Sequence, residues 1–231
     1  MPRQAKLMFL LALSGLAAAG SAHAASGTVT FVTGEVTVQR KDGTKVTATK
    51  GTAINAGDTV ETLDLWKTDL PAFDGQVIDS KYVILHGKQH APDQKKAWEA
   101  VERVIRRFTE ADKYLFSLPM WNFGIPYRLK HFFDVIVQPG YTFSFSPKEG
   151  YKGLVTGKPA AVVYARGGAY PPGSDGEALD LQKRYMELIL GFIGFRDTQA
   201  IVAEPTLGKP DQVEKQVEAA LQKAKAVAAK F

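Results

Sequence analysis

Hydrophobic and polar positions alternate in two different ways along the chain, and the change falls near residue 58. From Gly27 to Arg40, apolar residues alternate with Thr and Gln, which is typical of a half-buried strand, and Gly34 interrupts the run where a turn or bulge would sit. The Asp42-Gly43 pair is a strong hairpin signal, and a second Thr- and Val-rich run follows it from Lys45 to Thr49. This stretch predicts three short antiparallel strands.

Beyond residue 58, short apolar runs alternate with segments of helical period. Pro92 to Phe108 is the clearest helix, because its apolar residues recur along one face and charged residues occupy the other. Ala160 to Ala165 is an unbroken apolar run, as in a strand covered on both faces. The other predicted elements are strands over Val60–Leu65, Lys113–Leu118 and Gln199–Ala203, and helices over Tyr127–Val137, Glu177–Phe192 and Pro210–Lys230. Strands that alternate with helices indicate a parallel α/β sheet.

The first 24 residues have the three-part layout of a secretory signal peptide. Arg3 and Lys6 form a basic start, an apolar stretch runs from Leu7 to Gly20, and small residues end the segment at Ala24. An apolar stretch of about 14 residues is too short to cross a bilayer as a stable helix. Cleavage after Ala24 is therefore favoured over anchoring, no stable membrane insertion is expected, and the protein would be periplasmic or exported.

Composition narrows the possible chemistry. With 231 residues, of which 45% are hydrophobic, the chain can bury one substantial core. The absence of cysteine excludes disulfides, thiolate nucleophiles and cysteine-ligated metal sites. The formal charge of +5 would fall to +3 without Arg3 and Lys6, and no long basic run is present, so nucleic acid is not an expected partner. The four histidines show no metal-ligand spacing with acidic partners, and no metal is expected.

Two loops that follow strands have the composition of a ligand site, and in open parallel sheets ligands collect at the carboxyl ends of the strands. Pro119 to Pro126 presents aromatic rings, a thioether and an amide, which suits a flat heteroaromatic ring, although these side chains could instead cap the core. In the second loop, Gly167-Gly168 would let the backbone approach a ligand, and Arg166 could place positive charge beside an electron-accepting ring. An ordinary turn is the alternative there.

Ordered motifs run through the second part of the chain. They are Val60–Trp66, Lys81-Tyr82, Phe116–Pro126, Leu129–His131, Gly140–Phe143, Gly153-Leu154, Gly157-Lys158, Ala165–Tyr170, Leu190–Gly194 and Glu204-Pro205. In these motifs the chain resembles the FMN-dependent NADH-azoreductase family, relatives of the flavodoxin-like quinone reductases. The resemblance covers about residues 58–207 and extends toward the C-terminus. It implies a flavodoxin-like α/β fold with flanking helices, a homodimer with flavin sites near its interface, and ping-pong electron transfer from NADH to quinones and azo compounds.

The resemblance also implies which residues form the site. The isoalloxazine ring of FMN would be held by Met120, Trp121, Asn122, Phe123, Ala165, Arg166, Gly167 and Gly168. Phe143 and Phe145 would shape the pocket over the flavin. No catalytic acid or base is predicted, because the flavin carries the hydride chemistry. Arg166 and adjacent N–H groups are expected to stabilise the anionic reduced flavin.

The chain departs from the family ahead of Val60. Family members begin with a central strand that leads into a Ser- and Arg-bearing phosphate loop, which is not identifiable here. Residues 25–58 instead resemble the start of a FecR-type periplasmic sensor domain, in motifs such as Thr33-Gly34-Glu35-Val36 and Gly57-Asp58-Thr59-Val60. The predicted organisation is a signal peptide over 1–24, a FecR-type β segment over 25–58, and a flavodoxin-like domain over 59–231 without its usual first strand.

The missing strand is the central one in a sheet of order 2-1-3-4-5, and its loss would leave unpaired backbone groups in the middle of the sheet. Either Val29 to Val38 or Leu7 to Leu13 must substitute, or the sheet is incomplete. The second candidate is a buried strand followed by a Ser14-Gly15 turn, and export would remove it. Two alternatives to the enzyme remain open, a non-enzymatic exported FecR-type sensor or binding protein and an inactive fusion. The azoreductase family itself is cytoplasmic.

Overall fold

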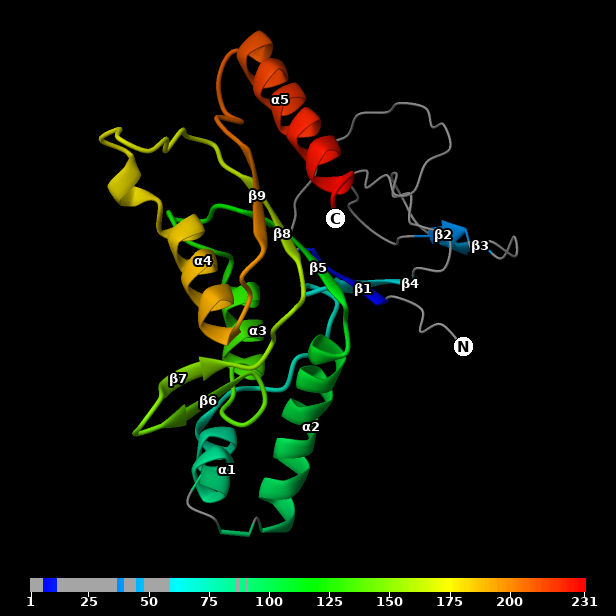
Figure 1. The fold of residues 1–231 in the computed structure, drawn as a ribbon, viewed down its shortest axis with the longest axis vertical. Coiled ribbons are helices and arrows are strands. Elements are labelled where there is room, and N and C mark those ends of the chain that lie inside the picture. Colours follow the sequence, from blue (N-terminus) through cyan, green and yellow to red (C-terminus); the bar gives the residue numbers. More distant parts are fainter. Residues whose placement is uncertain (1–5, 12–36, 40–44, 48–58, 86–87, 90) are drawn as a thin grey trace.

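A five-stranded parallel sheet runs through the fold, with the strand order β4-β1-β5-β8-β9 (Figure 1). The computed structural model describes residues 6–11, 37–39, 45–47, 59–85, 88–89 and 91–231. The strands of the sheet are β1 (Lys6–Leu11), β4 (Thr59–Asp64), β5 (Lys113–Pro119), β8 (Ala160–Ala165) and β9 (Thr198–Ala203). This is the flavodoxin-like order, and the four strands predicted beyond residue 58 are present to within one residue.

The central position of the sheet is filled by β1. It pairs with β4 from Lys6↔Thr59 to Leu11↔Asp64, and with β5 from Leu7↔Lys113 to Leu11↔Ser117. The sheet is therefore complete, and its central strand comes from the apolar run at the start of the chain. The same residues belong to the predicted signal peptide, so cleavage after Ala24 would remove β1 from the sheet. The Ser14-Gly15 turn lies outside the described residues.

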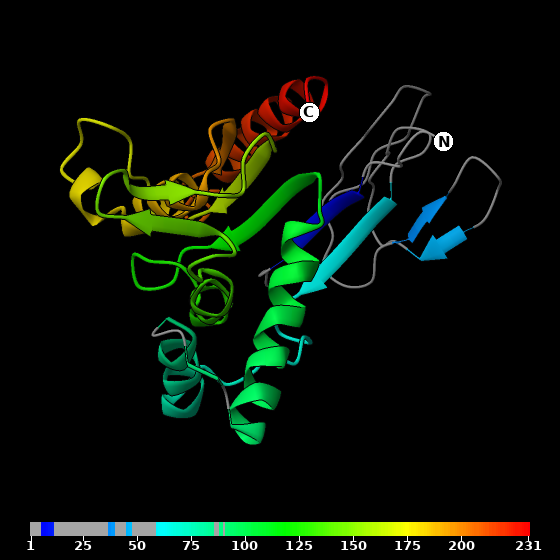
Figure 2. The ribbon, with the colours of Figure 1, turned by 60° about the horizontal axis from the view of Figure 1, so that its bottom comes forward.

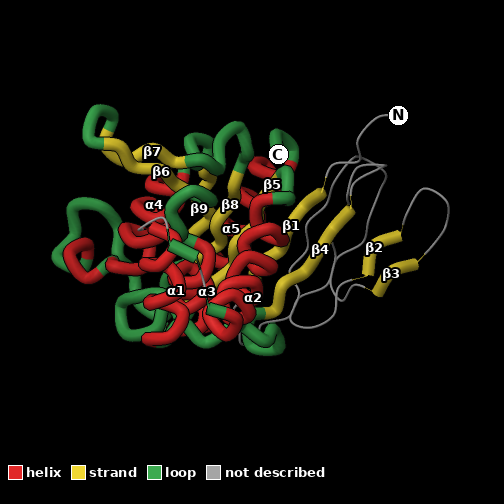
Figure 3. Tube along the Cα trace, turned by 90° about the horizontal axis from the view of Figure 1, so that it is seen from below, coloured by secondary structure: helices red, strands yellow, loops and turns green. Residues whose placement is uncertain are grey.

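A short antiparallel pair lies beyond the β4 edge of the sheet (Figures 2 and 3). It consists of β2 (Thr37–Gln39) and β3 (Lys45–Thr47), with Val38 opposite Val46. The predicted hairpin is confirmed for these two strands. The Asp42-Gly43 turn and the rest of the predicted FecR-type segment lie outside the described residues.

Helices cover the two faces of the sheet unequally. They are α1 (Gly75–Leu85), α2 (Pro92–Thr109), α3 (Tyr127–Ile136), α4 (Leu181–Ile193) and α5 (Pro210–Ala228). On one face, α2, α3 and α4 build the larger core with residues such as Phe108, Phe132 and Met186. On the other, α5 contributes Val227 to a small cluster that also contains Ile201. Among the described helices, none has the length and apolar composition needed to span a membrane.

Three local features differ from the prediction. A 3-10 turn at Glu177–Leu179 precedes α4, which begins only at Leu181 because the Asp180 side chain accepts a hydrogen bond from the Lys183 N–H at 2.9 Å and caps the helix. Helix α1 was not predicted. Neither was the antiparallel hairpin of β6 (Phe143–Ser146) and β7 (Gly150–Gly153), which packs against α4.

Candidate functional site

The loops that follow β5 and β8 leave the sheet side by side. Pro119 is paired with Ala165 at the last position of the β5–β8 register, and the Met120 N–H donates to the Ala165 carbonyl at 2.9 Å. We call residues 119–126 the first corner and residues 165–170 the second corner. The two sequence-predicted loops therefore lie together at the carboxyl edge of the sheet, as parallel strands require, and form one candidate site.

The first corner closes in a tight left-handed turn. Trp121 and Gly124 exchange two backbone hydrogen bonds of 3.0 and 2.9 Å. Between them, Asn122 has a φ of 48° and Phe123 a φ of 68°, a region that side-chain-bearing residues seldom adopt. Within the described part of the chain, the N–H groups of these two residues donate no hydrogen bond. Strain of this kind concentrates at ligand-binding positions, so the turn makes the first corner a candidate site.

Aromatic rings at the first corner are open to solvent rather than packed into the core. Trp121 is 42% exposed and Phe123 44%. The Trp121 ring lies 5.4 Å from Trp66 and 6.3 Å from Tyr127, and Phe123 approaches Tyr170 edge-on at 6.5 Å. Trp121 and Phe123 therefore do not cap the core, which was the alternative for this loop.

Trp66 follows β4, and its loop is held by α3. The Arg128 guanidinium donates from Nε to the Leu65 carbonyl at 2.9 Å and from Nη2 to the Thr68 carbonyl at 2.6 Å. The sequence showed Trp66 within a motif but did not assign it to the site. Its approach to Trp121 in space places Trp66 beside the first corner.

The second corner offers further free donors. The N–H groups of Gly167, Gly168 and Ala169 donate no hydrogen bond within the described residues. Neither glycine has a positive φ. A Cβ at Gly167 would come within 2.7 Å of the Leu207 side chain, and one at Gly168 within 3.0 Å of the Tyr170 hydroxyl. The paired glycines therefore make room for neighbouring side chains.

The structure places the Arg166 guanidinium inside the protein. Its side chain is 2% exposed, and Nη1 forms ion pairs with Asp180 at 2.8 Å and Glu204 at 3.2 Å. Nε donates to Gln182 at 3.0 Å, whereas Nη2 is buried and has no hydrogen-bond partner among the residues that the structure describes. From the sequence, the positive charge of Arg166 was expected beside an electron-accepting ring. The structure instead pairs this charge with the carboxylates of Asp180 and Glu204, so that Arg166 contributes only its backbone to the second corner.

Two tyrosine rings flank this buried cation. The Arg166 guanidinium carbon lies 5.2 Å from the Tyr164 ring centre and 5.9 Å from that of Tyr170. Burial raises the pKa of Tyr164, the nearby Glu187 adds to the rise, and Arg166 opposes it. Tyr164 therefore stays neutral at physiological pH.

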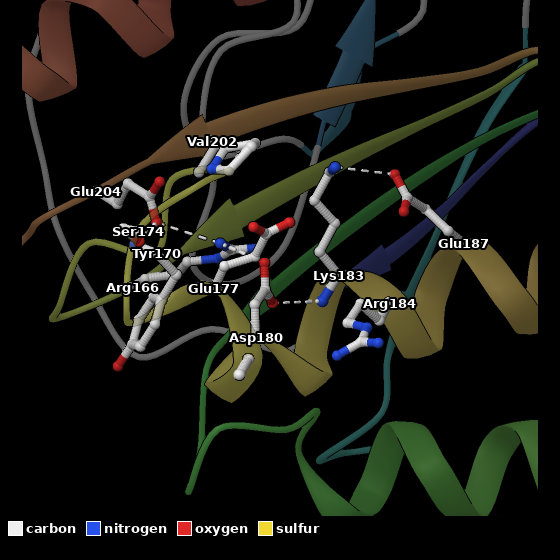
Figure 4. Close-up of a pocket in the computed structure, with 12 residues that line it drawn as sticks. Arg166, Tyr170, Ser174, Glu177, Asp180, Lys183, Arg184, Glu187, Val202 and Glu204 are labelled. Atoms are coloured by element: carbon white, nitrogen blue, oxygen red, sulfur yellow. Dashed lines mark hydrogen bonds and ion pairs between the residues drawn. The ribbon is translucent and has the colours of Figure 1, made fainter.

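A pocket of about 510 Å³ lies beside the buried cation, between the start of α4 and the ends of β8 and β9 (Figure 4). Charged side chains line much of it, including Arg166, Asp180, Lys183, Arg184, Glu187 and Glu204. Lys183 and Glu187 form an ion pair of 3.1 Å on its rim. The pocket borders the second corner through Arg166 and Tyr170, whereas none of residues 119–126 lines it.

Phe143 and Phe145 lie on β6, at the opposite end of α4 from the second corner (Figure 1). Phe143 contacts Phe192 at 4.8 Å between ring centres, and Phe145 contacts Tyr151 at 4.9 Å. The 13 residues of α4 span about 18 Å, and the Arg166–Asp180 ion pair places the second corner beside the start of this helix. A single chain therefore does not bring these two rings to the corners.

The described residues fit the ring end of a flavin. Five N–H groups from the two corners donate to none of the described residues, and together with an exposed amide and exposed aromatic rings they suit a flat heterocycle with polar edges. A phosphate loop would follow the central strand, and residues 12–36 lie outside the description. Among the described residues, no group of three or more His, Asp or Glu side chains is arranged to hold a metal ion, and His86 and His90 are not described.

Comparison with known proteins gives consistent matches. Residues 31–228 match a family model described as a flavodoxin-like fold, and this range includes residues assigned from the sequence to the FecR-type segment. An FMN-dependent NADH:quinone oxidoreductase of Nitratidesulfovibrio vulgaris (strain DP4) is 51% identical over 178 residues, covering 77% of this chain and 85% of the relative. One from Desulfotalea psychrophila is 54% identical over 148 residues, covering 64% and 69%.

Solved structures agree with these relatives. An azoreductase from Bacillus anthracis str. Sterne has 32% identity and a TM-score of 0.69, covering 75% of this chain and 83% of that one. An FMN-dependent NADH-azoreductase from Bacillus anthracis str. Ames Ancestor, in complex with FMN, has 25% identity and a TM-score of 0.65, covering 74% and 82%. The chain therefore belongs to the family of the FMN-dependent NADH:quinone oxidoreductases, with a flavodoxin-like fold.

Proposed function

We propose that this chain binds FMN and transfers electrons from NADH to quinones and azo compounds. The observation that carries the proposal is the junction of the two corners, which are joined by the bond from Met120 to Ala165 and carry free N–H donors and exposed rings on one edge. The relatives that this chain matches are named for the same cofactor and reaction. The FMN complex of the azoreductase from the Ames Ancestor strain supports the cofactor.

The residues at both corners would hold the ring. They are Met120, Trp121, Asn122, Phe123, Ala165, Arg166, Gly167 and Gly168, with Arg166 acting through its backbone. When bound, FMN supplies a carrier that accepts hydride from NADH and passes electrons to the acceptor. The free N–H groups of Gly167 and Gly168 are fixed donors that favour negative charge near them, and the rings of Trp121 and Phe123 exclude water.

We infer that the active form is a homodimer. Phe143 and Phe145 do not reach the corners of their own chain, but in a dimer they could reach those of the partner. Apolar side chains are exposed on β6 and on α4, since Phe145 is 60% exposed and Leu188 is 70% exposed. Light scattering of the FMN-loaded protein should give twice the chain mass, and a monomer with full activity would contradict the dimer.

The enzyme needs its first residues, because β1 is the central strand. We propose that residues 6–11 remain in the active protein, so that an exported form would have to keep the predicted signal segment uncleaved. The intact mass of active protein purified from cells should include these residues. An active species that begins at Ala25 would contradict the proposal and favour export with cleavage.

FMN loading tests the function directly. After loading and extensive dialysis, the protein should retain absorbance near 450 nm and oxidise NADH with menadione as acceptor. A colourless and inactive protein that still unfolds cooperatively would contradict the enzyme and leave the sensor or binding protein as the alternative. Cooperative unfolding is the control, because it separates a lost cofactor from a lost fold.

A further inference from the structure

Gln182, in the first turn of α4, connects the two corners from inside the protein. Its side chain is completely buried. The amide oxygen accepts the 3.0 Å hydrogen bond from Arg166 Nε, and the amide nitrogen donates to the Leu118 carbonyl at 3.4 Å. Leu118 directly precedes the first corner, and Arg166 belongs to the second. The Gln182 side chain is therefore hydrogen-bonded to the start of the second corner and to the residue before the first corner.

Arg166 extends this connection to β9. Glu204 accepts from Arg166 Nη1 at 3.2 Å and from the Tyr170 N–H at 3.1 Å. The backbone N–H of Arg166 donates to the Ala203 carbonyl at 3.1 Å, and its carbonyl accepts from the Thr206 N–H at 2.7 Å. The buried network thus ties together the ends of β5, β8 and β9 and the start of α4.

Burying the Arg166 charge costs free energy, and this cost favours a single, fixed arrangement of the network. A buried guanidinium is costly unless it is paired and hydrogen-bonded, and here two carboxylates and one amide surround Arg166. Removing one partner leaves a buried charge or donor unsatisfied, so the side chains have little freedom to rearrange. The free N–H groups of Gly167 and Gly168 follow Arg166 directly in the chain, and their positions depend on where Arg166 is held.

We propose that Gln182 and Arg166 are positioning residues, which fix the spacing between the corners and thereby the affinity for the flavin and its reduction potential. This inference rests on the proposed function. Neither side chain needs to touch the ring, because each acts through the backbone donors that it places. Donors placed beforehand favour the reduced, anionic ring more than the oxidised ring, since hydrogen bonds to a charged acceptor are about twice as strong.

Gln182→Met tests the connection, because methionine keeps the length of the side chain and removes both hydrogen bonds. Affinity for oxidised FMN should fall about tenfold. Affinity for the reduced form should fall about tenfold more, which lowers the midpoint potential by about 30 mV for a two-electron couple. Glu187→Gln is the matched control on the same helix. It removes the charge that pairs with Lys183 and lies near Tyr164, keeps both hydrogen bonds of Gln182, and should leave both quantities within twofold of the wild type.

Unchanged affinity and potential in folded Gln182→Met would overturn the proposal and leave the network a purely structural one. If that variant does not fold, Arg166→Lys replaces it, since lysine keeps the charge but cannot reproduce the bond from Nε. Its potential should fall in the same direction, and an unchanged potential would likewise overturn the proposal.

Backbone amide spectra of the flavin-free protein separate this proposal from the proposed function. Gln182→Met should shift the signals of residues 122–123 and 167–169 together, and Glu187→Gln should shift neither group. Shifts confined to α4 would overturn the coupling of the corners. Failure of the wild type to bind FMN would contradict the proposed function, while the amide shifts would still decide whether Gln182 couples the two corners.

Discussion

At the scale of single residues, Asn122 and Phe123 in the turn of the first corner are the non-glycine residues of the described chain that have a positive φ. Asn122 adopts this region more readily than most residues, because its short polar side chain can bond locally, whereas Phe123 has no such compensation. A phenylalanine held at φ 68° costs about 1–2 kcal/mol relative to ordinary backbone. Retaining it there is consistent with a role of its ring at the flavin.

Phe123→Gly should therefore separate stability from binding. Glycine removes the left-handed cost but adds about 0.5–1 kcal/mol of chain entropy to folding, so the free energy of unfolding should stay the same or rise by up to about 1.5 kcal/mol. Loss of the ring should weaken FMN binding about fivefold, equivalent to about 1 kcal/mol. Urea unfolding and fluorescence titration measure the two quantities. A clear loss of stability, or unchanged affinity, would contradict this account of the turn.

Tyr185 predicts how stability responds to alkaline pH. Burial raises its pKa from 10.0 to about 12, and Asp134 adds to the rise. The folded state thus holds this proton more tightly than the unfolded state, so the stabilisation is complete below pH 10 and is lost as pH rises toward 12. Unfolding at several pH values should show the decline. Tyr185→Phe should reduce the slope between pH 10 and 12, and an identical slope would contradict the assignment.

The sequence could identify residues of both corners but not the direction of the Arg166 side chain. Its partners Gln182 and Glu204 are 16 and 38 positions away, and no local pattern shows that both approach Arg166. Paired glycines and an arginine were therefore interpreted as facing a ligand. The sequence does not indicate the contribution of Trp66 for the same reason, since its contact with Trp121 joins the loops that follow two separate strands, β4 and β5.

At the scale of elements, the β6–β7 hairpin is fixed to α4 by a close backbone contact. A Cβ at Gly153 would overlap the backbone nitrogen of Gly194, which ends α4 with a φ of 119°. The Val155 N–H also donates to the Ile193 carbonyl at 2.8 Å. The hairpin that carries Phe143 and Phe145 is therefore seated by the C-terminal end of α4.

Two glycine substitutions should have opposite effects. Gly153→Ala should lower the free energy of unfolding by about 1–3 kcal/mol, because backbone must move to admit the methyl group. Gly191→Ala lies within α4 with no atom within 4 Å of the added carbon, and should raise it by up to about 1 kcal/mol. Urea unfolding of the two variants provides the comparison. Equal effects would show that the contact at Gly153 is not tight.

The sequence predicts best those helices and strands whose buried residues recur at a regular spacing. Helix α2 buries Trp98, Val101, Ile105 and Phe108 on one face, and that stripe is visible in the sequence. The sequence does not predict helix α1 because its apolar residues lie on two faces: Val77 is buried, whereas Ile78 and Tyr82, four residues apart, are exposed. The β6 and β7 strands are four residues each, too short for a period to emerge.

At the scale of the whole molecule, the fold depends on whether the first residues are retained, because they form the central strand β1. An apolar run of this length can be a buried strand or the core of a signal peptide, and periodicity alone cannot separate them. The parallel pairing of β1 with both β4 and β5 resolves the position in the sheet. The partners of β1 lie more than 50 positions away in β4 and more than 100 positions away in β5, so a local sequence pattern cannot reveal this pairing.

Removal of residues 1–24 should therefore abolish the fold. The truncated chain lacks β1, so backbone groups of β4 and β5 lose their partners in the middle of the sheet. We expect it to show no cooperative unfolding and no FMN binding, whereas the full chain shows both. Circular dichroism during thermal unfolding measures the difference. A truncated protein that unfolds cooperatively and binds FMN would show that β1 is dispensable.

The central claim is that two corners of one sheet edge together hold the ring of FMN, and amide spectra recorded during an FMN titration test it most directly. Signals of Asn122, Phe123, Gly167, Gly168 and Ala169 should shift and become protected from exchange with solvent. The indole signal of buried Trp98 should stay in place as an internal control. Tight FMN binding that leaves either corner unshifted would contradict the account.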